Sequence, residues 1–148
     1  MKALRVVPLF FVVALAGCED VYGIGGRDFE GFYSYAGTVD DAIGDAVVGE
    51  VTITRQRGRY ADVSIDWSYI DNGEEVIRIQ TEIPAEADLF SDGDIYFVFE
   101  GELFTDGEVV DFRLEHDGRL RGRTITGWWR LTTGLPTDDE GSFTASRN

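Results

Sequence analysis

Hydrophobic and polar residues alternate with a period of two along most of the chain after residue 28. In the clearest stretch, ADVSIDWSY at 61–69, every odd position is apolar or aromatic and every even position is polar. This alternation is typical of a β-strand that buries one face and exposes the other. Because no helical periodicity of similar strength follows residue 28, the pattern predicts an all-β domain.

Turn signals divide the alternating runs into strands. Asx-Gly and Arg-Gly pairs suit the tight turns of β-hairpins, and they occur at Arg57-Gly58, Asn72-Gly73, Asp92-Gly93, Asp106-Gly107 and Asp117-Gly118. The runs between them predict eight strands, at 29–39, 46–56, 59–70, 75–83, 94–104, 108–116, 119–132 and 141–147. Most connections are short, which favours antiparallel neighbours in a meander. The two longer connections are 84–93 and 133–140.

An open meander of this length would leave two unpaired edges, so we expect it to close into an eight-stranded antiparallel up-and-down β-barrel. The polar positions of the strands, such as Asp62, Asp66 and Glu115, would then face outward. A barrel that spans a membrane needs an apolar outer face, which these residues do not provide. A two-sheet β-sandwich remains the alternative, because counting strands does not separate the two folds.

The first 17 residues have the pattern of a secretory signal peptide: two cations, a short apolar run, expected to be helical, and small residues at its end. Leu15-Ala16-Gly17-Cys18 resembles the lipobox of bacterial lipoproteins. The resemblance implies cleavage before Cys18, a diacylglycerol on its sulfur and an acyl chain such as palmitate on the new amine. Acyl chains of this kind anchor a protein durably in a membrane.

The lipobox also implies a domain organisation and a location. Residues 1–17 would be the signal peptide, 18–28 the lipidated cysteine with a flexible glycine-rich tether, and 29–148 a single barrel domain. The protein is then expected in the cell envelope, anchored through the lipid on Cys18. Glu19 follows the cysteine where inner-membrane lipoproteins tend to have aspartate, which favours the outer membrane. As Cys18 is the only cysteine, packing must stabilise the domain without a disulfide.

The chain is strongly acidic, with 28 Asp and Glu against 13 Lys and Arg and a net charge of −15. Such a charge repels polyphosphate, so the sequence argues against nucleic-acid binding. It also repels anionic lipid headgroups, so we expect membrane contact through the lipid and not through a basic patch. The acidity itself favours solubility.

Both ends of the predicted barrel resemble those of lipocalin-like and avidin-like proteins. Gly31-Phe32-Tyr33 resembles the G-x-W element that opens such barrels, with tyrosine in place of tryptophan. Arg147 stands where lipocalins place an arginine that stacks over that aromatic ring. The resemblance implies that Tyr33 and Arg147 meet where the first and last strands pair, which would help to close the barrel.

Aromatic residues are the main candidates for a binding site. The alternation turns five of them inward, where they either line a pocket for a small apolar ligand or fill the barrel: Tyr33, Trp67, Phe97, Phe99 and Phe112. One member of the Trp128-Trp129 pair should face outward, since neighbouring residues of a strand point to opposite faces.

Residues suited to catalysis or metal binding are few. His116 is the only histidine and is expected at a strand end, in a structural role. Asp88, Asp92 and Asp94 are weak candidates for calcium ligands, but their spacing fits no EF-hand loop. We therefore expect no cofactor, no metal and no enzymatic activity.

These observations favour a lipid-anchored envelope protein that binds a small apolar ligand without catalysis. The alternative is a protein-interaction or envelope-structural module with a filled core, which would contact an envelope protein through 84–93 and 133–140.

Overall fold

The structure is a computed structural model that describes residues 27–105, 107–133 and 139–148. The predicted signal helix, Cys18 and most of the predicted tether lie outside the described residues. Within these ranges, no helix is long and apolar enough to cross a bilayer. The described residues form nine strands: β1 Gly31–Thr38, β2 Ala46–Arg57, β3 Tyr60–Asp71, β4 Glu74–Gln80, β5 Ala85–Leu89, β6 Asp94–Thr105, β7 Glu108–Arg121, β8 Thr124–Thr133 and β9 Asp139–Arg147.

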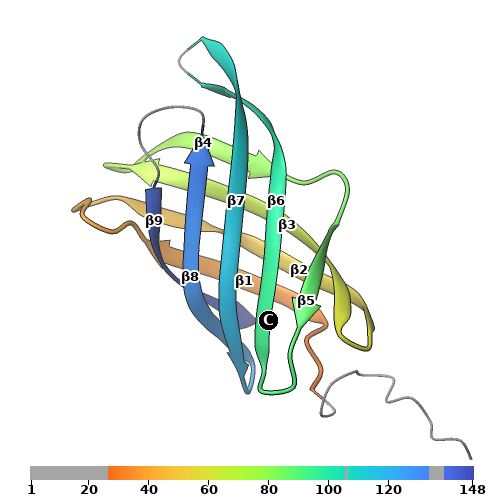
Figure 1. Cartoon of the computed structure of the whole chain (residues 1–148). Coiled ribbons are helices and arrows are strands. Elements are labelled where there is room, and N and C mark those ends of the chain that lie inside the picture. The colour runs from red at the N-terminus through yellow and green to blue at the C-terminus, as the bar shows by residue number, and fades with distance from the viewer. Residues whose placement is uncertain (1–26, 106, 134–138) are drawn as a thin grey trace, which may run out of the picture.

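The strands form one antiparallel sheet that closes on itself (Figure 1). The order is β2-β1-β9-β8-β7-β6-β5-β3-β4, and β2 also pairs with β3. Both β4 and β5 pair with β3, β5 at Tyr60–Val63 and β4 at Asp66–Asp71. The two short strands therefore share one position in the wall, and the domain is a closed barrel of eight strand positions. The predicted barrel is confirmed in place of the sandwich.

One predicted connection contains a strand. The segment 84–93, expected to be a loop, includes β5, in which Ala87 and Leu89 are buried. The strand before it is shorter than expected and ends at Gln80. Pro84 marked a break in the pattern, and the alternation that follows is only five residues long, so the sequence signal was too short to identify β5.

One predicted turn is wrong. Asp117-Gly118 lies inside β7, and the hairpin turn follows at Gly122, which has a φ of 62°. A Cβ atom at Gly118 would come within 2.8 Å of Ile125 Cγ2 and 3.0 Å of the Phe143 ring. Glycine is therefore required there for close packing and not for a turn. By contrast, Asn72-Gly73 and Asp92-Gly93 are turns, with glycine φ angles of 90° and 98°.

Candidate functional site

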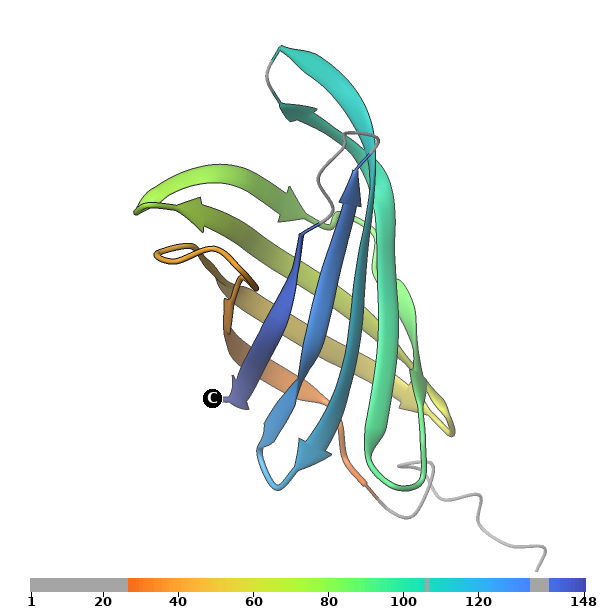
Figure 2. The same ribbon diagram turned by 60° about the vertical axis from the view of Figure 1, so that its left-hand side comes forward.

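Residue 27 leads into β1 at one end of the barrel, which we call the anchor end (Figures 1 and 2). Side chains close the barrel at this end. Tyr33 pairs with Arg147 across β1 and β9, and the guanidinium lies 5.4 Å from the ring centroid. Arg147 Nη2 donates to the Tyr33 hydroxyl at 2.8 Å, and Nη1 donates to an Asp28 carboxylate oxygen at 3.1 Å. Burial raises the pKa of Tyr33, and the guanidinium offsets part of that shift. The structure thus brings the two predicted closure residues together.

A glutamine completes the seal. The Gln56 side chain accepts from the Phe29 amide at 2.9 Å and donates to the Arg27 carbonyl at 2.8 Å. Phe29 is buried, and its carbonyl accepts from the Tyr33 hydroxyl at 2.8 Å. The chain entering the barrel is therefore held by side chains of β1, β2 and β9. Composition gave no sign of this use of Gln56, because a glutamine in a strand is unremarkable until its partners are known.

Aromatic rings fill the middle of the barrel. Trp67 and Trp129 are fully buried, with ring centroids 5.5 Å apart in edge-to-face contact. Phe97 stacks on His116 at 4.7 Å, and Tyr35 stacks on Phe143 at 5.1 Å. Ring pairs at these separations contribute dispersion and quadrupole energy beyond simple burial. Tyr33, Trp67 and Phe97 point inward as expected, but they pack against other side chains of the core.

His116 lies in this core and not at a strand end, which corrects the prediction for its position. It is completely buried in β7, and Nε2 is 3.1 Å from the Tyr35 hydroxyl. Burial lowers the pKa of His116 to about 3, so the imidazole is neutral at physiological pH. Nδ1 has no hydrogen-bond partner within the described residues. A neutral ring enclosed by Phe97, Phe99 and Phe143 serves here as a core residue.

The wall opens at the other end, which we call the groove end. Within the described residues β4 pairs only with β3, and β6 beyond Phe97 pairs only with β7. Figure 2 shows β4 and the β6–β7 hairpin diverging above β5. A groove of about 690 Å³ lies between them. Its apolar lining comes from both sides: Ile77, Ile79, Phe99, Leu103 and Phe112.

The rim of this groove is unusually apolar for an acidic protein. Phe104 is 74 % exposed, Ile83 is 83 % exposed and Val76 is 49 % exposed. Charged side chains on the same rim include Arg78, Glu82 and Glu102. Of the five aromatic residues predicted to bind ligand, only Phe99 and Phe112 reach this groove. The groove was not predicted, because it results from two strands sharing one wall position.

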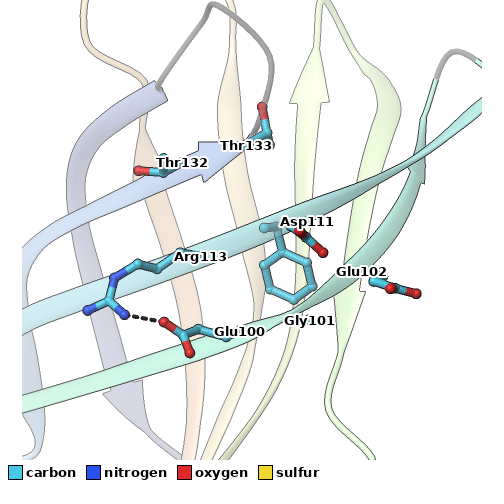
Figure 3. Close-up of a pocket in the computed structure, with 8 residues that line it drawn as sticks. Glu100, Gly101, Glu102, Asp111, Arg113, Thr132 and Thr133 are labelled. Carbon is cyan, nitrogen blue, oxygen red and sulfur yellow. Dashed lines mark hydrogen bonds and ion pairs between the residues drawn. The ribbon is translucent and has the colours of Figure 1, made fainter.

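A second hollow of about 590 Å³ lies beside the β6–β7 hairpin (Figure 3). Phe112 lines both hollows, and its ring lies over Gly101, where a Cβ atom would be 3.1 Å from Phe112 Cε1. The remaining side chains are polar, and Arg113 forms an ion pair with Glu100. The second hollow therefore lacks the apolar lining of the groove.

The structure does not bring the three aspartates considered for calcium into one cluster. Asp92 and Asp94 both bind the Arg119 guanidinium, at 3.0 and 2.9 Å. Hydrogen bonding to Arg119 lowers the pKa of Asp94. Asp88 lies opposite Tyr60 and Tyr96 in the sheet. No cluster of three possible metal-ligating side chains was found in the described ranges.

The tryptophan pair divides as expected. Trp129 is buried, and its indole nitrogen donates to the Thr38 carbonyl at 3.1 Å. Trp128 faces outward and is 42 % exposed. The Arg130 guanidinium lies 5.7 Å from its ring centroid, a cation–π contact that covers part of the ring.

No protein-family model matches the chain, and no curated protein matches it. Two solved structures are similar. One is described as a redesigned beta barrel, mFAP1, bound to DFHBI, with a TM-score of 0.51, 13 % identity and coverage of 80 % of this chain and 94 % of that one. The other, EF1p2_mFAP2b bound to DFHBI, has a TM-score of 0.55, 8 % identity and coverage of 80 % and 93 %. At these identities the likeness concerns the barrel fold.

Proposed function

We propose that the protein is a lipid-anchored lipoprotein of the cell envelope, and that it binds a small apolar ligand in the groove between β4 and β6 without catalysis. The observation that carries the binding proposal is the groove itself. Its volume of about 690 Å³ falls within the ~300–1,000 Å³ typical of ligand pockets. Its floor includes the buried Ile79 and Phe99, so an apolar guest would extend the hydrophobic core.

The packed rings favour the groove over the barrel centre as the site for the proposed ligand. Trp67 and Trp129 contact each other, and Phe97 contacts His116. A guest there would have to separate these pairs. Phe99 and Phe112, in contrast, already line the groove. The two similar structures, both described as bound to the small molecule DFHBI, support small-molecule binding by a barrel of this architecture.

The anchor is proposed from the sequence at Leu15-Ala16-Gly17-Cys18. Replacement of Cys18 by serine removes the sulfur that would carry the lipid. The Cys18→Ser variant should leave the membrane fraction, and mass spectrometry of the wild-type N-terminus should show acyl chains. Outer-membrane sorting is proposed on the basis of Glu19 and is tested by fractionating the two membranes. Unmodified Cys18 in membrane-bound protein would refute the anchor.

A protein partner is the second candidate function. The specific observation in its favour is a pair of strand edges, β4 and the distal part of β6, that face the groove and have no ladder partner among the described residues. Unpaired edges accept an extended segment of another chain. This function uses backbone groups and not the apolar side chains of the groove, so substitutions of those side chains separate it from ligand binding.

Titration with a fluorescent apolar probe tests the favoured function. Val76→Asp and Phe104→Asp place a carboxylate on exposed rim positions, where folding should be retained. We expect each to weaken probe binding about tenfold, the effect of placing a charge beside an apolar guest. Val48→Asp is the matched control, because Val48 is 41 % exposed and lies outside the groove lining. Absence of probe binding, or an equal loss in Val48→Asp, would contradict the proposal.

A further inference from the structure

The arginines of this acidic protein are concentrated at the anchor end. After residue 18 every basic residue is an arginine, 11 in all once Lys2 and Arg5 are left out of the 13. Strand directions place most of them near the turns and termini of the anchor end (Figures 1 and 2): Arg27, Arg55, Arg57, Arg59, Arg119, Arg121, Arg123 and Arg147. The remaining three, Arg78, Arg113 and Arg130, lie further along the barrel.

Two hairpin turns at this end have the same sequence. Arg57-Gly58-Arg59 joins β2 to β3, and Arg121-Gly122-Arg123 joins β7 to β8. The glycines have φ angles of 61° and 62°, and all four arginines are exposed. These turns are 64 residues apart in sequence. Closure of the barrel brings both to one end.

Several of these guanidinium groups are not neutralised by the protein. Within the described ranges, Arg59 and Arg121 form no ion pair. Arg57 lies 3.6 Å from Asp62, and Arg123 donates to the terminal Asn148 oxygen at 2.9 Å. Four of the neighbouring carboxylates are occupied, because Asp28, Asp62, Asp92 and Asp94 each pair with an arginine. Four others at this end form no ion pair within the described ranges: Glu30, Glu86, Asp88 and Asp117.

Exposed aromatic side chains accompany the arginines. Tyr60, next to Arg59, is 41 % exposed, and Phe90 in the β5–β6 turn is 40 % exposed. The Arg59 guanidinium lies 5.9 Å from the Tyr60 ring centroid. Basic residues bind anionic headgroups, and aromatic rings insert at the level of the headgroups. The surface therefore has the chemistry of a membrane-contacting face.

The path of the chain leads to the same surface. Arg27 is nine positions after Cys18, and at ~3.5 Å per position this segment spans about 30 Å at most. Arg27 lies beside the β5–β6 turn, where Nε donates to the Ser91 carbonyl at 3.3 Å. A lipid on Cys18, as proposed above, would keep the anchor end close to the bilayer surface.

We propose that the anchor end docks on anionic phospholipid headgroups through its two Arg-Gly-Arg turns. This rests on the proposed lipid anchor for its orientation, and it revises the expectation that the acidic chain avoids such lipids. Strand β2 has 12 residues and is about 40 Å long, several times the ~8 Å Debye length at physiological ionic strength. Carboxylates of the groove end are thus screened from the bilayer. The groove would face away from the membrane.

Vesicle co-sedimentation tests the docking without the lipid. The closed sheet lies within residues 27–148, so the chain from residue 19 retains the whole barrel. Vesicles of phosphatidylcholine alone are compared with vesicles containing about one-third phosphatidylglycerol. We expect binding only to the anionic vesicles, with loss at high salt. The R57Q/R59Q/R121Q/R123Q variant should bind at least about tenfold more weakly, while R78Q/R113Q/R130Q should bind like the wild type.

Three results with vesicles would overturn the docking proposal. These are equal binding to both vesicle types, no binding to anionic vesicles at low salt, and an equal loss in the R78Q/R113Q/R130Q control. Equal pelleting without vesicles would show that the protein aggregates or self-associates and does not bind lipid, which also overturns the proposal. The mass of the wild-type N-terminus tests the anchor independently, so failure of the lipid and failure of the docking are distinguishable.

Discussion

The two ends of the barrel differ in how their strands are closed off. Side chains close the anchor end, whereas strand edges at the groove end stay unpaired within the described residues. At the anchor end, Arg147 joins Tyr33 and Asp28, and Gln56 binds the entering backbone. At the groove end, β4 and β6 part, and their facing edges have no ladder partner in the described structure. Charge follows the same division, with arginines at the sealed end and few at the open one. The difference separates a part of the fold that provides closure from a part that is available for binding.

Truncation of a side chain in the packed centre of the barrel should have the largest effect on the free energy of unfolding. Phe97 is 2 % exposed and stacks on His116, whereas Phe104 at the groove rim is 74 % exposed. Phe97→Ala should lower the free energy of unfolding by about 3–5 kcal/mol through cavity formation. Phe104→Ala should change it by less than ~0.5 kcal/mol. Urea denaturation measures both, and similar losses would remove the distinction between the two regions.

Acid should lower the stability of the folded protein through the buried His116. The pKa of His116 is about 3 in the folded protein, below its ordinary value of 6.5, because burial disfavours the charged ring. The unfolded chain therefore binds the proton first, and stability falls as the pH drops from about 6.5 towards 3, by about 1.4 kcal/mol per pH unit. His116→Phe should remove this contribution while keeping a ring in the core.

The measurement is the difference between the stability curves of wild type and His116→Phe from pH 7 to pH 4. The comparison is needed because the pKa values of Asp66 and Asp94 are also lowered, by hydrogen bonds to Arg78 and Arg119. Protonation of these two carboxylates in acid therefore also lowers the stability of the protein. Their contribution is common to both proteins. Parallel curves would show that His116 is not buried as a neutral group.

The contacts of Arg147 that close the anchor end should contribute less to the free energy of unfolding than the buried core does. Arg147→Ala removes the hydrogen bonds to Tyr33 and Asp28 together with the cation–π contact, and we expect a loss of about 1–3 kcal/mol. Arg130→Ala is the matched control, since Arg130 likewise combines an ion pair, with Glu140 at 2.7 Å, and a cation–π contact, with Trp128, but in a half-exposed position. Such surface pairs are worth ~1 kcal/mol or less. Thermal unfolding of both variants decides whether the seal exceeds an ordinary ion pair.

The fold was predictable because burial repeats at every second residue, and the side chains of β3 show how regular that signal is. The division of one wall position between β4 and β5 was not, since it depends on which strands pair. The turn predicted at Gly118 was wrong because close packing and a tight turn can both require glycine, and the sequence does not show which one applies. The arginine surface was missed for another reason. The net charge of the chain does not show where the charged residues lie in the fold, and only closure of the barrel brings residues 57–59 and 121–123 to the same end.

Chemical-shift mapping with an apolar probe tests the central claim most directly, namely that the guest occupies the groove and not the packed centre. The methyl signals of Ile77, Ile79 and Leu103 report on the groove, and the indole N–H signals of Trp67 and Trp129 report on the centre. We predict that saturating probe shifts the three methyl groups and leaves both indoles in place. Movement of the indoles with unchanged methyl groups would contradict the account.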